Sequence, residues 1–389
     1  MRGIVGISSV PWDYLPIAPQ QTLKNLAQKQ PVLFVERQRS IAGALIEPGK
    51  AWQDTVRIVS GLREGAPNLK VLTPPFAAPW TASSMLANRI SMSSLRLSAQ
   101  RAAKSLGFDK PVVITYVPQA HLLREAFSES CFVYDVIDEY SAFPNMNLAM
   151  CKELEEKMCQ KADLVFAISE NLVEDRKKLH DRVFHLPIGA ETKRFQKMER
   201  GVALPAEIEG KQRPIVGYYG SIDDRMDMEF CLAAATELVH VTFLFFGPVR
   251  ANANIGELKA LKNVFFPGPI DYEKLPQYSV NFDVCVLPYA NTRFNQYIFP
   301  NKIFEYLATG NPVVTSDVPS IRYLARSGML TIAKNAKEYV ASVKEAIKSR
   351  DVGQEDRRNC ALENTWQNRA KTMWQEIVKF LQEKGEEVE

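Results

Sequence analysis

A lysine and a glutamate, Lys302 and Glu305, stand three residues apart in the sequence. At that spacing they share one face of a helix, which Pro300 and Asn301 would start and Gly310 would end. An ammonium at a helix N-terminus attracts phosphates, and a carboxylate accepts hydrogen bonds from paired hydroxyls. The pair therefore predicts a site for a diphosphate and a ribose. The alternative is an ordinary Lys-Glu pair on a crossover helix.

Four further residues are candidates for the same diphosphate and ribose site. Gly220 ends an apolar run and would let the backbone come close to phosphates, although a plain turn is the alternative. Arg225 would neutralise charge on a departing diphosphate, or is an exposed loop arginine. Tyr289 follows another apolar run and would form part of the wall that contacts the base or the sugar. The alternative is an aromatic side chain at the rim of the site. Asn301 would help Glu305 to bind ribose and sugar hydroxyls.

The first half of the chain contains candidate groups for acid-base chemistry. Asp138 directly follows the apolar run 132–137, and His121 lies just after the run 111–117. A carboxylate at such a strand end would deprotonate an acceptor hydroxyl or bind sugar hydroxyls, and His121 is the reserve candidate for the base. Trp12 and Asp13 are acceptor-side candidates after the first run, 3–7. A structural hydrogen bond is the alternative for Asp138 and His121.

The elements that would position these residues alternate between apolar runs and amphipathic segments. This pattern predicts an α/β protein with two doubly wound, Rossmann-like domains facing a cleft. No GxGxxG follows the first run, so a dinucleotide fingerprint is absent. We expect an N-terminal domain at 1–190, a polar linker at 191–212, a C-terminal domain at 213–364 and a final helical segment at 365–389. Ile58-Val59 and residues 69–72 are expected as short strands.

The segment from Ser83 to Lys104 is basic and helical in pattern. It contains Arg89, Arg96 and Arg101 with Lys104, several apolar residues and no acidic residue. Such a helix would lie on an anionic membrane surface or face a lipid-linked acceptor. The alternative is the solvated basic face of a core helix.

Composition sets broad limits on the class of protein. The 389 residues are 46% hydrophobic and 24% charged, which is ordinary for a globular protein of two domains. The net charge is +3, divided as +7 over residues 1–130 and −4 over the rest, and no nucleic-acid-binding motif accompanies it. Six scattered cysteines indicate buried thiols in a reducing compartment, so we expect a cytoplasmic protein with no structural metal.

The order of several segments resembles that of a known family. YDVIDEY, ADLVFAISE, LPIGAE, GYYGSIDDRMD, FDVCVLPY and FPNKIFEYLATGNPVV occur in this order, and the resemblance is strongest over 132–320. The chain resembles GT-B glycosyltransferases of the family 4-like, group 1 branch, which builds bacterial surface polysaccharides. In that resemblance Glu305 matches the carboxylate that grips the donor ribose, and the pair Pro300 and Lys302 matches a subset in which a lysine reaches the phosphates. Two positions depart: Tyr297 stands where many retaining members have a glutamate, and Asp138 stands near their catalytic histidine.

The resemblance implies a metal-independent glycosyltransferase with a nucleotide-diphosphate sugar as co-substrate and no other cofactor. The acceptor would be lipid-linked or a saccharide, at the inner face of the cytoplasmic membrane, and nucleic acid is not an expected partner. It also implies that the last helix crosses back to the first domain. The two departures favour inversion with Asp138 as the base, and retention stays open. The alternatives are a non-catalytic relative that binds a nucleotide sugar or a partner subunit, and a nucleotide-sugar epimerase.

Overall fold

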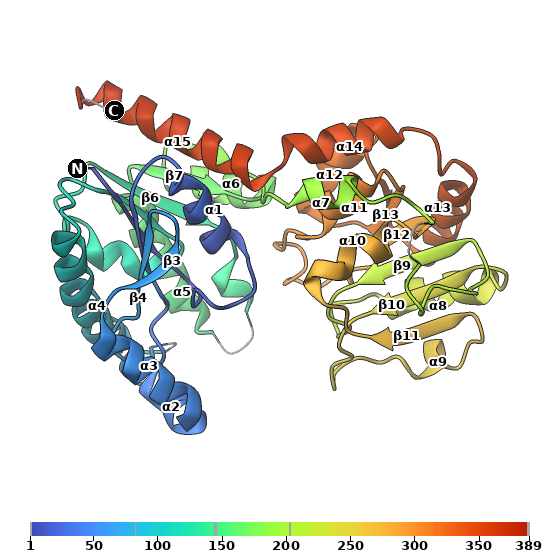
Figure 1. The fold of residues 1–389 in the computed structure, drawn as a ribbon, viewed down its shortest axis with the longest axis horizontal. Coiled ribbons are helices and arrows are strands. Elements are labelled where there is room, and N and C mark those ends of the chain that lie inside the picture. Colours follow the sequence, from blue (N-terminus) through green and yellow to red (C-terminus); the bar gives the residue numbers. More distant parts are fainter. Residues whose placement is uncertain (1, 82, 144–145, 202–203, 387–389) are drawn as a thin grey trace. The chain divides into compact units, whose positions relative to one another are not determined.

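The computed structural model describes residues 2–81, 83–143, 146–201 and 204–386. It divides the chain into two compact units, one running up to Ile188 and resuming at Trp366, the other spanning Gly189–Thr365. Each unit is a largely parallel β-sheet with packed helices (Figure 1). The predicted fold class, two doubly wound Rossmann-like domains, is confirmed.

The first unit contains an eight-stranded sheet in the order β3-β4-β2-β1-β5-β6-β7-β8. Only the edge strand β3 is antiparallel to its neighbour. The strands are β1 (Ile4–Ile7), β2 (Val32–Val35), β3 (Arg63–Ala66), β4 (Leu69–Leu72), β5 (Val112–Thr115), β6 (Cys131–Val136), β7 (Leu164–Ala167) and β8 (Val183–His185). Every residue of β1, β2, β5, β6 and β7 is buried, as expected for parallel strands covered on both faces.

Helices cover this sheet, with α1 packed against the last helix, α15, and both α4 and α5 packed against η1. The helices of the unit are α1 (Ala18–Leu26), α2 (Ile41–Ile46), α3 (Pro48–Ser60), α4 (Met85–Ser105), η1 (Pro118–Leu123), η2 (Tyr140–Ala142), α5 (Leu148–Lys161), α6 (Glu170–Lys177) and α15 (Trp366–Glu383). The helix α15 therefore packs within the first unit although it follows the second in sequence. Its Arg369 guanidinium donates to Asp135 Oδ1 at 2.8 Å, and both side chains are buried.

The second unit contains a six-stranded parallel sheet in the order β11-β10-β9-β12-β13-β14. Its strands are β9 (Ile215–Tyr219), β10 (Thr242–Phe246), β11 (Val264–Gly268), β12 (Val284–Leu287), β13 (Val313–Ser316) and β14 (Thr331–Ala333). Its helices are α7 (Thr192–Gln196), α8 (Met228–Glu237), α9 (Gly256–Lys259), η3 (Tyr272–Lys274), α10 (Leu275–Ser279), α11 (Ile303–Thr309), η4 (Pro319–Ile321), α12 (Arg322–Arg326), α13 (Ala336–Lys348) and α14 (Gln354–Glu363). α8 packs with α13, and α11 packs with α7, α10 and α14.

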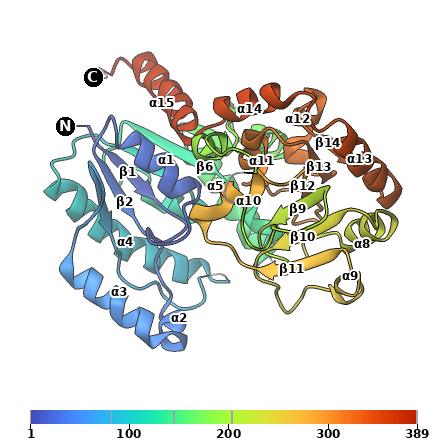
Figure 2. The same ribbon diagram turned by 45° about the vertical axis from the view of Figure 1, so that its right-hand side comes forward.

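Two passages differ from the sequence-based expectation. Ile58 and Val59, expected as a strand, lie in the helix α3, which Pro48 starts at its first position (Figure 2). Two β-branched residues are too short a run to outweigh the helix formers that precede them. The passage 191–212, expected as a linker, belongs to the second unit and begins with α7, whose Phe195 is fully buried.

Candidate donor and acceptor sites

The start of the helix α11 positions Lys302, which is half-buried, and Glu305, which is buried, in the second unit. Lys302 is the residue that precedes the helix, and Gly310 ends it in the left-handed conformation with φ of 84°. All seven residues of α11 are buried, including Glu305. An ordinary surface helix would leave its polar residues in water. Burial of the Glu305 carboxylate costs free energy, so hydrogen-bonding partners must compensate for the water that it loses.

Glu305 accepts hydrogen bonds from two tyrosines. The Tyr219 hydroxyl lies 2.6 Å from Oε2, and the Tyr272 hydroxyl lies 3.3 Å from Oε1. Burial raises the pKa of Glu305, while the bond from Tyr219 opposes that rise because it stabilises the charged form. Glu305 is thus a rigidly held acceptor with one short and one long hydrogen bond. The long bond at Oε1 is the weaker one and is the easier one for an incoming hydroxyl to replace.

Lys302 does not pair with Glu305. Its Nζ donates to the Tyr218 hydroxyl at 3.3 Å and lies 4.5 Å from the centre of the Tyr218 ring. Burial, followed by the nearby charge of Arg225, lowers the pKa of Lys302 to about 8. Because the half-buried Lys302 ammonium lies close to a second cation, an anion placed between the two cations would stabilise both. The alternative reading of an ordinary Lys-Glu pair therefore does not describe this site.

Gly220 follows β9 and lies directly against Lys302. Its φ is 142°, a conformation that side chains disfavour, and an added Cβ would collide with the Lys302 ammonium. Gly247, at the end of the neighbouring strand β10, approaches so closely that its Cβ would collide with the Gly220 carbonyl oxygen. Two glycines thus bring backbone to the carboxyl ends of two adjacent strands, where open α/β sheets bind ligands.

Arg225 and Tyr289 lie on two loops that are joined to each other. The Ala290 N–H donates to the Arg225 carbonyl at 2.8 Å, and Met226 pairs with Tyr289 as an antiparallel bridge. The Arg225 guanidinium makes two bonds to Asp223, of 2.8 and 2.6 Å, so part of its charge is already matched. The structure therefore brings Arg225 and Tyr289 together, and Arg225 lies close enough to Lys302 for its charge to act on the ammonium.

Pro300 and Asn301 form the turn before α11. Pro300 is buried, and its carbonyl accepts from the Ile303 N–H at 2.9 Å. Asn301 is exposed and has no hydrogen bond to another described residue. The turn therefore sets the direction of α11, and the Asn301 amide remains open to a ligand.

Sequence reasoning missed the tyrosines of this site. Tyr218 and Tyr219 are the last two residues of β9, and alternate side chains along a strand point to opposite faces. They bond Lys302 and Glu305, respectively, while Tyr272 comes from η3. The run GYYG carried a weak signal, since two tyrosines precede the glycine at a strand end.

In the first unit, Asp138 and His121 follow neighbouring strands, β6 and β5. The Asp138 carboxylate has no hydrogen-bond partner among the described residues, and burial raises its pKa to about 7. His121 is buried, its Nδ1 lies 3.0 Å from the Pro118 carbonyl, and burial lowers its pKa. Asp138 is consequently the better candidate for a group that exchanges a proton near neutral pH.

The acceptor-side candidates Trp12 and Asp13 lie after β1. Asp13 is paired with Arg57 at 2.8 Å and with Arg63 at 3.2 Å, which makes it a structural anion rather than a free base. The backbone N–H of Trp12 donates to Glu36 Oε1 at 2.8 Å. Beside them lies a cavity of about 240 Å³. It is lined by residues at the ends of β2 and β4 and from α2 and α3, among them Glu36, Arg37, Gln38, Ser40, Ile58 and Thr73.

Arg89, Arg96 and Arg101 are exposed on α4. None of the three has an ion-pair partner among the described residues. They belong to the first unit, whereas the candidate donor residues all belong to the second.

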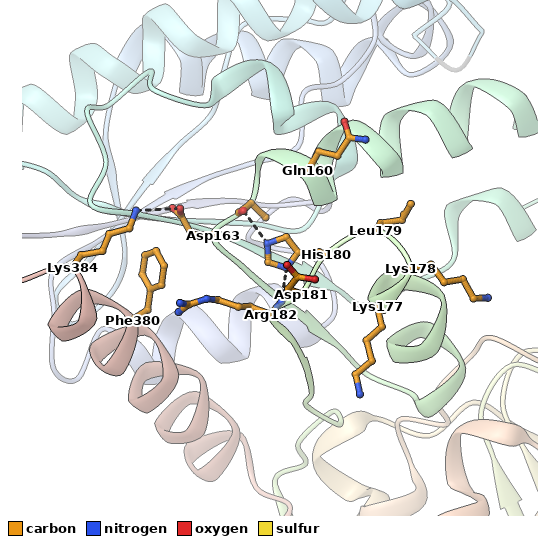
Figure 3. Close-up of a pocket in the computed structure, with 11 residues that line it drawn as sticks. Gln160, Asp163, Lys177, Lys178, Leu179, His180, Asp181, Arg182, Phe380 and Lys384 are labelled. Atoms are coloured by element: carbon orange, nitrogen blue, oxygen red, sulfur yellow. Dashed lines mark hydrogen bonds and ion pairs between the residues drawn. The ribbon is translucent and has the colours of Figure 1, made fainter.

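A larger cavity, of about 560 Å³, lies at the opposite edge of the first sheet (Figure 3). It is lined by basic residues around Phe380, including Lys177, Lys178, Arg182 and Lys384. The C-terminal ends of α5, α6 and α15 all meet here, and cations are expected where helices end. Arg182 and Lys384 are moreover paired with Glu383 and Asp163. These cations complement the helix ends, so we assign no ligand to this cavity.

The second unit thus combines a rigid carboxylate, two cations and two glycine turns near the carboxyl ends of its central strands. Cations stabilise charge that develops on a phosphate leaving group, and a carboxylate accepts from paired hydroxyls. This set of groups suits a nucleotide diphosphate. A carboxyl with a pKa near neutrality in the first unit suits deprotonation of a hydroxyl.

Comparisons with known proteins agree with this chemistry. Residues 213–349 match the family model of glycosyl transferases group 1. The chain is 26% identical over 285 residues to a Bacillus subtilis (strain 168) protein named as the teichuronic acid biosynthesis glycosyltransferase TuaH, covering 68% of this chain and 70% of that protein.

Solved structures share the whole fold. Sucrose-phosphate synthase from Thermosynechococcus elongatus matches with a TM-score of 0.72 at 18% identity, over 97% of this chain and 99% of that chain. Anabaena HepE in complex with UDP matches with a TM-score of 0.68 at 13% identity, over 97% of this chain and 100% of that chain. Together, the two parallel-sheet domains, the family-model match over residues 213–349 and the related sequence identify this chain as a glycosyltransferase with the GT-B fold.

Proposed function

We propose that this glycosyltransferase moves a sugar from a nucleotide-diphosphate donor to a lipid-linked or saccharide acceptor in the making of a surface polysaccharide or glycolipid, without a metal ion. The observation that carries the proposal is the separation of Lys302 from Glu305: each is held by its own tyrosine, at 3.3 and 2.6 Å. A cation and a carboxylate kept apart are both free to bind a ligand. The named role of TuaH in teichuronic acid biosynthesis supports the acceptor class.

The donor would bind to the second unit. Glu305 would accept from the ribose hydroxyls, and the diphosphate would lie by Gly220 between Lys302 and Arg225. These two cations would match the charge that grows on the diphosphate as the glycosidic bond breaks, which is the role that a metal ion fills elsewhere. Tyr289 would contribute to the wall of the site, and Asn301 would bind a sugar hydroxyl.

The acceptor would meet the first unit. Asp138 would remove the proton from the acceptor hydroxyl, and its pKa of about 7 suits a base that works near neutral pH. The cavity beside Glu36 and Arg37 is the proposed place for the acceptor, next to Trp12. Attack assisted by Asp138 favours inversion at the anomeric carbon.

Incubation with a panel of UDP-, GDP- and TDP-sugars tests the proposal. We expect slow release of nucleoside diphosphate from at least one donor, unchanged by EDTA and abolished in Glu305→Ala. Binding without release would favour a non-catalytic nucleotide-sugar-binding protein. Interconversion of two nucleotide sugars with no acceptor present would favour an epimerase. Loss of activity in EDTA would contradict the metal-free part.

A further inference from the structure

The surface formed by α2, α3 and α4 exposes an unusual amount of apolar side chain. Nineteen large hydrophobic residues are exposed among the described residues, and ten of them fall between 41 and 97, about one seventh of the chain. Single exposed apolar residues are normal on a protein surface, but a concentration of them marks an interaction site. The ten are Ile41, Leu45, Ile46, Trp52, Val56, Val59, Trp80, Leu86, Ile90 and Leu97.

The helix α3 exposes a stripe of apolar side chains. Its outer stripe is Trp52, Val56 and Val59, at spacings of four and three, with exposures of 69%, 47% and 82%. The inner face is mixed: Asp54 accepts from Arg39 at 2.7 Å, and Ile58 lines the cavity beside Glu36. A surface helix normally buries its apolar stripe. The exposed stripe of α3 is therefore a candidate contact surface for a partner outside the chain.

The helix α2 continues this apolar surface. Its sequence, IAGALI, has no polar side chain, none of its residues is buried, and Leu45 and Ile46 are 80% and 81% exposed. The helix α3, which packs against α2, likewise has no buried residue. Both helices are held to the rest of the unit, since the Ile41 N–H of α2 donates to the Ala77 carbonyl at 3.0 Å and Asp54 of α3 accepts from Arg39 at 2.7 Å. Figures 1 and 2 show α2 and α3 as an outer layer of the first unit.

The adjoining helix α4 adds positive charge to the apolar surface. Leu86, Ile90 and Leu97 form its exposed centre, and Arg89 and Arg96 lie on one flank of that stripe. Arg101 lies on the other flank, because residues follow each other at about 100° around a helix. An apolar stripe bordered by arginines is the pattern of a helix that lies in a membrane interface.

We infer that α2, α3 and α4 dock this protein on an anionic lipid bilayer, with Leu45, Ile46, Trp52 and Val59 inserted among the acyl chains and the α4 arginines on the headgroups. This inference rests on the lipid-linked acceptor of the proposed function. The charge of the α4 face favours an anionic bilayer over a second copy of the chain as the partner. The exposed α4 face carries four cations and no anion, which would repel a like face but attract anionic lipid.

The described part of the chain has no helix that is long and apolar enough to cross a membrane, so the attachment would be interfacial. In the inferred mode of binding, the apolar side chains insert into the bilayer, in addition to the electrostatic attraction between the arginines and anionic lipid. Salt should therefore weaken binding without abolishing it, because apolar insertion is not screened.

Co-sedimentation of the full chain with vesicles tests the inference. The vesicles are either pure phosphatidylcholine or an equal mixture with phosphatidylglycerol. The variant Leu45→Ser/Ile46→Ser/Val59→Ser removes three exposed side chains and should not disturb the fold. The matched control is Val239→Ser/Val352→Ser in the second unit, whose side chains are 71% and 70% exposed.

We expect wild type and control to pellet with the mixed vesicles and the triple variant to lose about tenfold or more in partitioning, which corresponds to about 1.4 kcal/mol. Equal sedimentation of the triple variant, or no sedimentation of wild type at low salt, would overturn the inference. A wild-type dimer that the triple variant dissociates would instead assign the surface to a second copy. Nucleotide release from a soluble donor should be the same in all three proteins, so a failure of membrane docking is distinguishable from a failure of the proposed activity.

Discussion

Replacing Glu305 by glutamine is the sharpest test of the donor site. The amide keeps the shape of the carboxylate, and its oxygen can still accept from Tyr219, which now donates at 2.6 Å. The buried Tyr219 hydroxyl therefore keeps a partner, and the fold should remain intact. Alanine is the harsher change, because it would leave that hydroxyl unpaired, at a cost of about 1 to 3 kcal/mol.

The size of the effect follows from the geometry. A ribose hydroxyl would bond to a charged, buried oxygen, and such bonds are worth about 1.5 to 3 kcal/mol. The affinity for UDP should accordingly fall by about 10- to 150-fold in Glu305→Gln. Burial raises the pKa of Glu305. The wild-type affinity should therefore begin to fall, as the pH is lowered, at a higher pH than for an exposed glutamate, while the glutamine variant should show no such fall.

Isothermal titration with UDP, GDP and TDP measures the affinity, and thermal unfolding checks the fold. Glu257→Gln, on the exposed start of α9 in the same unit, is the matched control and should bind like wild type. A folded Glu305→Gln protein with unchanged affinity for every nucleotide would refute the assignment of the ribose site.

Three further predictions concern charged groups that are buried or half-buried. Lys302→Met should lower turnover more than donor affinity, and wild-type UDP affinity should weaken as the pH rises through about 8, where the ammonium loses its proton; an unchanged pH profile in the variant would count against this role. Asp138→Asn should reduce kcat by about 10² to 10⁴, and wild-type activity should fall below about pH 7 as Asp138 is protonated; NMR of a product with the donor's anomeric configuration would exclude Asp138 as an inverting base. Arg369→Met should lower the free energy of unfolding by about 3 to 5 kcal/mol, because it leaves Asp135 buried and unpaired; in urea titrations the exposed-pair control Arg182→Met should change it by about 1 kcal/mol or less.

The strand and helix order was readable from the sequence because it depends on local pattern. Short apolar runs such as PVVITYV and FDVCVLP stand between amphipathic segments, and buried parallel strands require that composition. The spacing of Lys302 and Glu305 likewise predicted that both would sit at the start of one helix. The fold class followed from such features without any knowledge of contacts.

The contacts of the site were decided by tertiary structure. Glu305 meets Tyr219 across 86 residues of sequence, and Asp13 meets Arg57 from a helix that was not expected at all. Partners so far apart are brought together only when the sheet is assembled, and no local pattern encodes their pairing.

Burial was decided in the same way. The sequence alone determined that Asp138 follows a strand and that Leu45, Ile46 and Val59 are apolar. Only the folded chain determined that Asp138 lies where desolvation raises its pKa to about 7, and that the three apolar side chains face outward. The physical reason is that a side chain's solvation depends on which elements pack around it, and that is a property of the whole assembled domain.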